Sequence, residues 1–210
     1  MKRENTPVLE TERLILRKFT MQDVDAVYRI FSDVEVNTFL PWFPIASKAE
    51  AEKFLYNRYL NTYRQPEAYA YAICLKCDNQ PIGYIHAETK IPYDFGYGLC
   101  KAFWHKGILT EAGTALIKQL RKDGIPYITA THDINNPRSG EVMKRLGMQY
   151  RYSYVEQWQP KNLTVTFRMY QMNLCQKQAS VYFGYWNMSE IHFIEASEAA
   201  ASCNCIADKR

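Results

Sequence analysis

The 210-residue sequence lacks a long apolar run and has little charge imbalance. No stretch approaches the roughly 18 apolar residues of a membrane-spanning helix, and residues 1–6 lack the apolar segment of a signal peptide. Lysine and arginine total 26 against 22 aspartate and glutamate residues, so the net charge of +4 does not indicate nucleic acid as the main partner. We therefore expect a cytoplasmic protein with no membrane or nucleic-acid partner.

The sequence also lacks a convincing zinc-binding pattern, although it has six cysteines. Cys74 and Cys77 form one close pair and Cys203 and Cys205 form another. The first pair ends a strand pattern and the second lies far away along the chain, whereas a structural zinc site needs four ligands at workable spacing. We expect reduced thiols, no metal and no redox chemistry.

With 47% apolar residues, the chain can bury the core of one domain. Helical periodicity and capping residues predict helices over residues 20–31, 47–65, 107–124 and 136–147. Alternating or buried-strand patterns predict strands over residues 14–17, 69–75, 82–88, 95–100, 127–130, 150–155 and 163–169. The order of elements is therefore strand, two helices, three strands, helix, strand, helix and two strands.

The window from Phe103 to Ala112 combines the end of a strand, a Lys-Gly turn and the start of a helix. The first amides of a helix have no intrahelical acceptor, and the helix dipole adds positive charge there. Gly107 allows a ligand to approach the backbone closely. The window predicts a binding site for an anion such as a diphosphate.

This window closely resembles a motif of the GNAT superfamily of N-acetyltransferases, as do the sequence DFGYGL at 94–99 before it and NPRS at 136–139 and LGM at 146–148 after it. The likeness is to the branch that acetylates protein N-termini, such as ribosomal-protein-alanine acetyltransferases, and to small-amine acetyltransferases. It covers about residues 9–174 and implies an α/β fold with a mixed, mainly antiparallel sheet flanked by helices. Residues 1–174 would form the GNAT domain and residues 175–210 an extension of unknown role.

The resemblance implies that acetyl-CoA is the co-substrate. Its diphosphate would bind the backbone at His105, Lys106, Gly107, Ile108, Leu109 and Thr110. A backbone N–H at Leu99 or Cys100 would stabilise the oxyanion, and Asn136 would anchor the cofactor arm. Trp104 and Leu109 depart from the family pattern Q/R-x-x-G-x-G/A, but neither removes a backbone donor.

The amine must lose a proton before attack, because a primary alkyl amine has a pKa near 10 and is mostly charged at neutral pH. We expect Glu88 or Glu156 to accept this proton, with His86 and His132 as further candidates. A glutamate at a strand end is also an ordinary surface residue, and a single histidine is often structural. The sequence leaves the identity of the base open.

The departing thiolate needs a hydrogen-bond or proton donor. Many members of the superfamily place a tyrosine where this chain has Met143, whereas the N-terminal acetyltransferase branch uses a serine that matches Ser139. We expect Ser139 to serve as this donor.

The segment 39–44 contains two prolines and cannot form a regular helix. Its aromatic residues Phe39, Trp42 and Phe43 either contact the acceptor or fill the core. We expect the loops around 39–44 and 157–162 to determine acceptor specificity.

The resulting hypothesis is an acetyl-CoA-dependent N-acetyltransferase acting on a peptide N-terminus or a small-molecule amine. One alternative is acetylation of an aminoglycoside or polyamine, which favours an acidic cleft that this mildly basic sequence does not indicate. Another is a non-catalytic acyl-CoA-binding regulator, suggested by the missing tyrosine. The sequence does not decide between a monomer and a homodimer.

Overall fold

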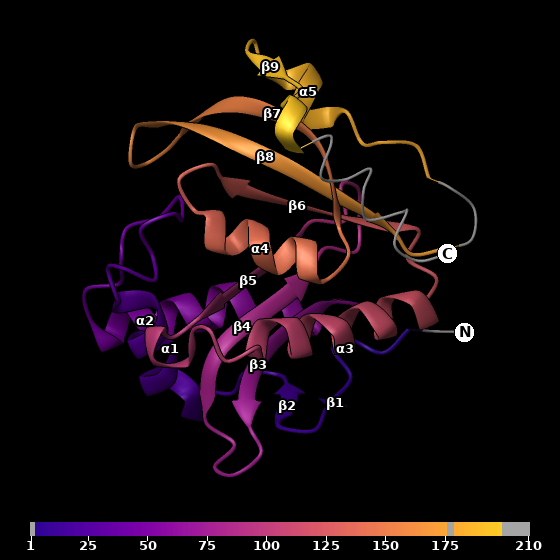
Figure 1. Ribbon diagram of the computed structural model, residues 1–210. Helices are drawn as coiled ribbons and strands as arrows, with labels where there is room; N and C mark the ends of the chain where they lie inside the picture. The colour runs from indigo at the N-terminus through magenta and orange to yellow at the C-terminus, as the bar shows by residue number, and fades with distance from the viewer. Residues whose placement is uncertain (1–2, 176–178, 199–210) are drawn as a thin grey trace.

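The computed structural model describes residues 3–175 and 179–198, which form two antiparallel sheets with helices on both sides (Figure 1). The first sheet has the strand order β1 (Leu9–Glu10), β2 (Leu14–Arg17), β3 (Tyr69–Leu75), β4 (Pro81–Ala87), β5 (Phe95–Leu99). The second has the order β6 (Tyr127–Asp133), β8 (Leu163–Asn173), β7 (Gln149–Trp158), β9 (His192–Phe193).

The two sheets meet between β5 and β6, which run parallel. Among the described residues, the backbone pairing between the two sheets is a single β-bridge of Asp94 with Thr129. At this bridge the Thr129 N–H donates to the Tyr93 carbonyl at 3.2 Å. Beyond this bridge the strands belong to separate sheets and are not paired. The junction therefore opens towards the C-terminal ends of both strands.

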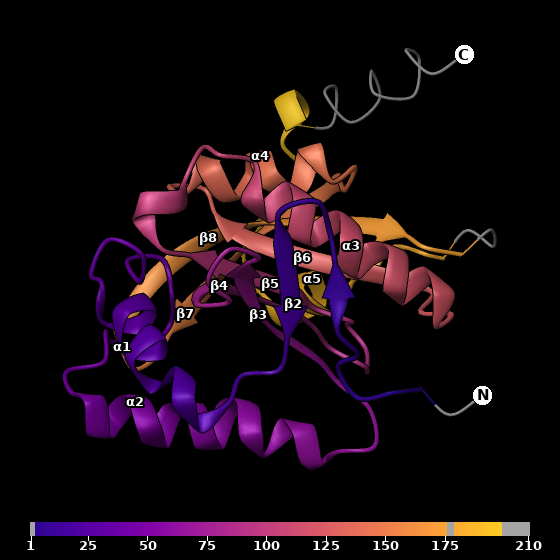
Figure 2. The same ribbon diagram turned by 90° about the horizontal axis from the view of Figure 1, so that it is seen from below.

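Helices α1 (Val24–Ser32) and α2 (Lys48–Leu55) cover one face of the first sheet, and α3 (Ile108–Lys122) covers the other (Figure 2). Alternation along β3 explains this arrangement, because successive side chains point to opposite faces. Tyr69, Tyr71 and Ile73 join the α3 core, whereas Ala70, Ala72 and Cys74 join the α1–α2 core. Helix α4 (Pro137–Arg145) packs over the second sheet.

The extension after β8 also packs against the second sheet. Helix α5 (Gly184–Met188) lies on the face opposite α4, and β9 pairs with the edge of β7 (Figure 1). Tyr185 stacks on Tyr154 with ring centroids 5.1 Å apart, and Trp186 meets Tyr152 edge-on at 5.4 Å. Glu195 then pairs with Arg168 on the face that carries α4. The described part of the extension thus wraps around the edge of β7.

The predicted α/β architecture is confirmed, and so is the predicted order of elements from β2 to β8, to which the structure adds β1, α5 and β9. Three further differences concern the predicted elements. The sheet is split in two rather than continuous. The predicted helix over 47–65 is an α-helix only to Leu55, followed by a π-helical turn over Tyr56–Leu60 and a 3-10 turn over Thr62–Arg64. Strands β6, β7 and β8 are longer than predicted, because ladder pairing extends them through polar residues.

None of the described helices is long and apolar enough to span a membrane. Residues 3–175 and 179–198 also contain no group of three or more His, Cys, Asp or Glu side chains placed to hold a metal ion. Cys74 is buried and free, Cys77 is exposed and free, and Cys203 and Cys205 lie outside the described residues.

Candidate functional site

A short turn precedes α3 and leaves the first backbone amides of the helix without a partner in the helix. His105 and Gly107 adopt left-handed φ angles of 61° and 73°, and the Glu111 N–H makes the first helical bond, to the Gly107 carbonyl at 3.0 Å. The preceding helical amides, at Ile108, Leu109 and Thr110, therefore have no intrahelical acceptor. Three adjacent N–H groups at the positive end of a 15-residue helix suit an anionic ligand.

Arg13 fixes this turn from the side. Its guanidinium donates to the Lys106 carbonyl at 3.0 Å and to the Glu111 carboxylate at 2.6 Å. Thr11 donates to the same carboxylate at 2.5 Å. The exposed side chains of His105 and Lys106 lie on the outside of the turn, so its anion-binding capacity rests on the backbone.

Strand β5 presents free backbone groups to the open junction. The Glu88 N–H donates to the Asp94 carbonyl and the Cys100 N–H to the Ile82 carbonyl, both at 2.8 Å. Since antiparallel ladder bonds alternate, the N–H groups of Tyr97 and Leu99 point away from β4, towards the junction with β6. Of the two donors expected from the sequence, the Cys100 N–H is therefore already engaged and the Leu99 N–H faces the junction.

The Leu99 carbonyl accepts a hydrogen bond from the Trp104 indole at 2.8 Å. Arg138 of α4 in turn lies over the Trp104 ring, 5.2 Å from its centroid. Trp104, which departs from the family pattern in sequence, therefore joins the end of β5 to the first turn of α4.

The α3 side of β5 carries a pair of hydroxyl groups. The Tyr97 hydroxyl donates to the Ser139 carbonyl at 2.7 Å and lies 3.1 Å from the Ser139 hydroxyl. Burial raises the pKa of Tyr97, so its phenol stays protonated. Asn136 caps α4 by accepting from the Ser139 N–H at 3.4 Å, and Met143 is buried in the core. Sequence reasoning missed Tyr97, which supplies a tyrosine hydroxyl beside Ser139 from β5 rather than from α4.

The opposite, α2 side of β5 carries a carboxylate that sequence reasoning also missed. Asp94, Gly96 and Gly98 share this face by alternation. Burial and, to a smaller extent, the negative charge of Glu88 raise the pKa of the Asp94 carboxyl, Arg58 lowers it, and the result is a pKa of about 7. A carboxyl group with a pKa near 7 can accept a proton at neutral pH.

Glycine at two positions of β5 makes room for side chains of β4. A Cβ at Gly96 would lie 2.4 Å from the His86 ring, and one at Gly98 would lie 2.5 Å from the Tyr84 ring. Burial and Arg58 lower the pKa of His86 to about 3, so the imidazole is neutral at physiological pH. The pattern Asp94-x-Gly96-x-Gly98 was the available sequence signal that this face of β5 receives side chains from a neighbouring strand.

An open groove of about 790 Å³ lies on the α2 side, which we call the α2 groove. It runs between the turns that follow α2 and the ends of β3 and β4. Its charged lining residues are Arg58, Glu67, Glu88 and Lys90, and further polar side chains come from Thr62, Gln65, His86 and Thr89.

The two predicted glutamates differ in position. Glu88 is exposed and lines the α2 groove, next to Asp94. Glu156 is on β7, where burial raises the pKa of its carboxyl, and its charge and that of Asp94 both reach Tyr154. The structure thus brings Glu88 and Asp94 together and leaves Glu156 on the neighbouring sheet.

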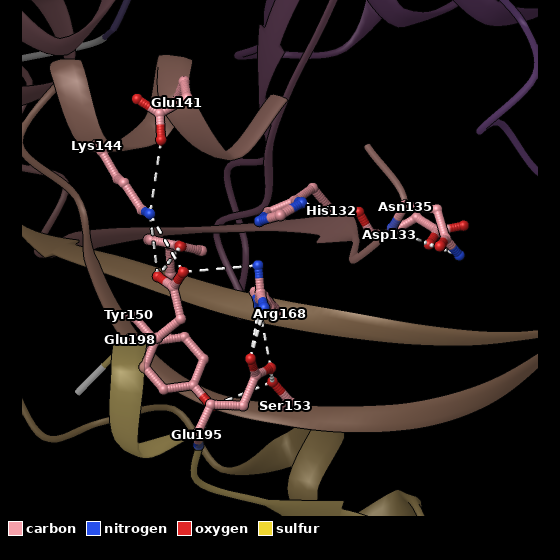
Figure 3. Close-up of polar contacts among 11 residues, drawn as sticks. His132, Asp133, Asn135, Glu141, Lys144, Tyr150, Ser153, Arg168, Glu195 and Glu198 are labelled. Atoms are coloured by element: carbon pink, nitrogen blue, oxygen red, sulfur yellow. Dashed lines mark hydrogen bonds and ion pairs between the residues drawn. The ribbon is translucent and has the colours of Figure 1, made fainter. Parts of the chain in front are cut away.

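His132 lies away from these carboxylates. Its side chain is 4% exposed, its Nδ1 is 2.8 Å from the Asp133 carbonyl, and its Nε2 faces Gly140 of α4. Burial lowers its pKa. On the same face of the sheet, Arg168, Lys144, Glu195 and Glu198 form a charged network that ties the extension to α4 and β8 (Figure 3).

The aromatic residues of 39–44 have different surroundings. Trp42 packs with Phe31 and Phe54, at centroid distances of 6.4 and 6.2 Å, and its indole N–H is buried. Phe43 is 61% exposed, and Phe39 is half-buried. Trp42 therefore packs in the core, which is the second of the two roles expected for this segment. Its contact with Arg58 also puts it beside the α2 groove.

The two loops expected to set specificity do meet. Lys161, at the tip of the β7–β8 hairpin, donates to the carbonyls of Asn37 and Thr38 at 3.0 and 3.2 Å. This contact joins the second sheet to the segment between α1 and α2, across from the β5–β6 bridge.

Comparison with known proteins gives a consistent result. A family model described as "Acetyltransferase (GNAT) domain" matches residues 13–149. The chain is 25% identical over 148 residues to "Uncharacterized N-acetyltransferase YoaA" of Bacillus subtilis (strain 168), an alignment that covers 68% of this chain and 83% of that protein.

Solved structures share the fold. A GNAT-family acetyltransferase from Bacillus anthracis has a TM-score of 0.70 at 22% identity, covering 80% of this chain and 99% of that one. RimL, a ribosomal L7/L12 alpha-N-protein acetyltransferase solved in complex with coenzyme A, has a TM-score of 0.68 at 19% identity, covering 80% and 98%.

Proposed function

Because this chain belongs to the GNAT family of acetyltransferases, we propose that it transfers the acetyl group of acetyl-CoA to a primary amine. The observation that carries this proposal is that the chain has two sets of free backbone donors. One is the amides at the start of α3, and the other is the Leu99 N–H at the open end of β5. The first suits a diphosphate and the second suits an amide-bearing arm or a developing oxyanion.

The residues present fit the demands of this co-substrate. Ile108, Leu109 and Thr110 would hold the diphosphate, with His105, Lys106 and Gly107 forming the turn around it. Asn136 fixes the first turn of α4, where Ser139 lies. Acetyl-CoA supplies an activated thioester, and the remaining chemistry falls to the side chains on the two faces of β5.

On the α2 side, Asp94 accepts the proton that the ammonium group must lose, and Glu88 beside it helps to hold that charge. The neutral amine then attacks the thioester carbonyl, and a backbone N–H of β5 that faces the junction, that of Tyr97 or of Leu99, donates to the oxygen on which negative charge develops. As the carbon–sulfur bond breaks, the Ser139 hydroxyl donates to the departing thiolate on the α3 side, and the Tyr97 hydroxyl holds Ser139 in place through its bond to the Ser139 carbonyl.

This division of roles places base and acid on opposite faces of β5 and three residues apart along the chain. Asp94 takes the first proton of the ammonium group on one face, and the second proton, lost from the attacking nitrogen as the carbon–sulfur bond breaks, neutralises the thiolate beside Ser139 on the other. Two hydroxyls beside the expected thiolate position favour catalysis over a non-catalytic acyl-CoA-binding regulator.

The acceptor is a primary amine, either of a peptide N-terminus or of a small molecule. The likeness to RimL supports the first class. A polycationic aminoglycoside or polyamine is less suited, because the α2 groove is not strongly acidic: it carries Arg58 and Lys90 as well as Glu67 and Glu88.

The test is a screen of acetyl-CoA against peptides, polyamines, aminoglycosides and small amines, with release of the CoA thiol as the readout. We expect thiol release that depends on the amine and a product acetylated on nitrogen. Binding of acetyl-CoA without turnover on any amine would instead support the regulator.

A further inference from the structure

Arg58 is a guanidinium with no carboxylate partner in the α2 groove. Arg13, Arg17 and Arg168 each pair with an aspartate or glutamate. No ion pair joins Arg58 to any carboxylate within 3–175 and 179–198.

The side chain is nevertheless held in place. Its guanidinium carbon lies 5.1 Å from the Trp42 ring centroid and 6.0 Å from that of Phe54. These aromatic rings cover one face of the planar group by cation–π contact. Because Arg58 also lines the groove, the N–H groups of its rim remain available to a ligand there.

The charges around the groove are arranged in two parts. The carboxylates of Asp94 and Glu88 lie at the ends of β4 and β5, whereas Arg58 comes from the turn after α2. The charge of Arg58 reaches His86 and Asp94 and lowers the pKa of both groups. The unpaired guanidinium therefore lowers the pKa of His86, which lines the groove, and the pKa of Asp94, which lies next to it.

We propose that Arg58 binds an anionic group, a carboxylate or a phosphate, on a small acceptor in the α2 groove whose primary amine is directed to the end of the groove at Glu88, next to Asp94. The planar fork of arginine matches both anions by paired N–H···O bonds. A volume of about 790 Å³ lies within the range of small-molecule sites. This inference rests on the proposed acetyl transfer and narrows its acceptor to an amine with a nearby negative charge.

The experiment compares acceptors that differ only in the anionic group. Phosphoethanolamine is paired with ethanolamine, β-alanine with propylamine, and a peptide with an acidic second residue with its amide counterpart. The ratio of kcat/KM within each pair measures anion recognition, and the pairs distinguish phosphate, carboxylate and peptide sources. We expect a ratio of about 10 to 100 for at least one of the small pairs, as for a hydrogen bond to a charged group.

Two variants test whether Arg58 is the residue that recognises the anionic group. Arg58→Gln should bring the ratio close to one, and Arg58→Lys should restore part of it. Arg64→Gln is the matched control, because Arg64 is exposed and lies over the Tyr56 ring outside the groove. A ratio that stays at the wild-type value in Arg58→Gln would overturn the assignment to Arg58.

A binding measurement separates this inference from the proposed function. With acetyl-CoA saturating, inorganic phosphate should raise the Tm of the wild type but not that of Arg58→Gln. Ratios near one in the wild type, with no phosphate effect, overturn the anion site while leaving acetyl transfer standing. A phosphate effect that needs Arg58, with no amine acetylated, would contradict the proposed function instead. Discrimination confined to the acidic peptide would contradict a small acceptor.

Discussion

Asp94 has its raised pKa because it is buried and because the negative charge of Glu88 lies nearby. As a base it must be deprotonated to act, so kcat/KM should rise as the pH increases through about 7. Asp94→Asn should lower kcat by about 100- to 10,000-fold and remove this rise. A pH profile of both proteins is the measurement. An unchanged profile in the variant would assign the titration to another group.

The raised pKa of Asp94 also predicts how the stability of the protein depends on pH. The folded-state pKa of about 7 lies above the unfolded value, so the folded protein binds more protons between about pH 4 and 7. The contribution of Asp94 to stability is therefore present at low pH and is lost as the pH rises through about 7. Asp94→Asn should raise the Tm at pH 8 and change it less at pH 5.

The Tyr97 hydroxyl donates to the Ser139 carbonyl and lies 3.1 Å from the Ser139 hydroxyl, so the two side chains should act together on the departing thiolate. Ser139→Ala should lower kcat by about 10- to 1,000-fold and Tyr97→Phe by about 10- to 100-fold, with little change in the affinity for acetyl-CoA. Their combined loss in the double variant should be smaller than the product of the single losses, because they share a partner. Steady-state kinetics on the three variants tests this, and normal turnover in Ser139→Ala would remove it from the mechanism.

At the scale of elements, local sequence was sufficient for α3 and α4. Leu109, Ala112, Leu116 and Leu120 repeat at helical spacing, and Asn136 caps α4 as predicted. Local sequence was not sufficient for β9, which has two residues and exists because it pairs with β7. It was also not sufficient for the split sheet, since the separation of β5 from β6 is a property of long-range packing.

Local sequence was likewise sufficient for one part of the candidate site and not for another. The turn at Gly107 was predictable because its backbone angle and the helix start are local properties. Asp94 and Tyr97 were missed because strand alternation shows which side chains share a face but not what each face meets. Glu88 was found, although its partner carboxylate was not.

The contact between the β7–β8 hairpin and the α1–α2 segment depends on one side chain. Lys161→Met would remove both donors to the Asn37 and Thr38 carbonyls while keeping the aliphatic stem. We expect a several-fold increase in the acceptor KM, because the loop is no longer held over the acceptor side, and an unchanged KM for acetyl-CoA. Lys118→Met on the exposed surface of α3 is the matched control. Equal increases in both KM values would contradict a local role.

At the scale of the whole molecule, the described part of the extension, residues 179–198, packs against the second sheet. It contributes Val181, Tyr182, Tyr185 and Trp186 to a cluster with Tyr152, Tyr154, Val165, Phe167 and Met169. Its carboxylates also pair with Lys144 of α4, which carries Ser139 on its first turn (Figure 3). We propose that residues 1–174 and the described part of the extension fold together.

Truncation after Cys175 should therefore expose the aromatic face of β7 and β8 and cause aggregation or a large loss of stability. A milder change is Trp186→Ala, which removes the contacts with Tyr152 and His192 and should cost about 1 to 3 kcal/mol. Met188→Ala, at a side chain that is 75% exposed, should be neutral. Denaturant unfolding measures all three, and wild-type stability in Trp186→Ala would indicate that the extension is not integrated.

The most direct test of the account is a calorimetric titration of the full chain with acetyl-CoA. We predict binding of one molecule per chain, strongly weakened in Gly107→Pro, where proline cannot adopt the φ of 73°, and only slightly weakened in Lys106→Ala. Circular dichroism would establish that both variants fold. No heat of binding in the wild type at millimolar acetyl-CoA, or equal losses in the two variants, would contradict a diphosphate site built from the backbone at the start of α3.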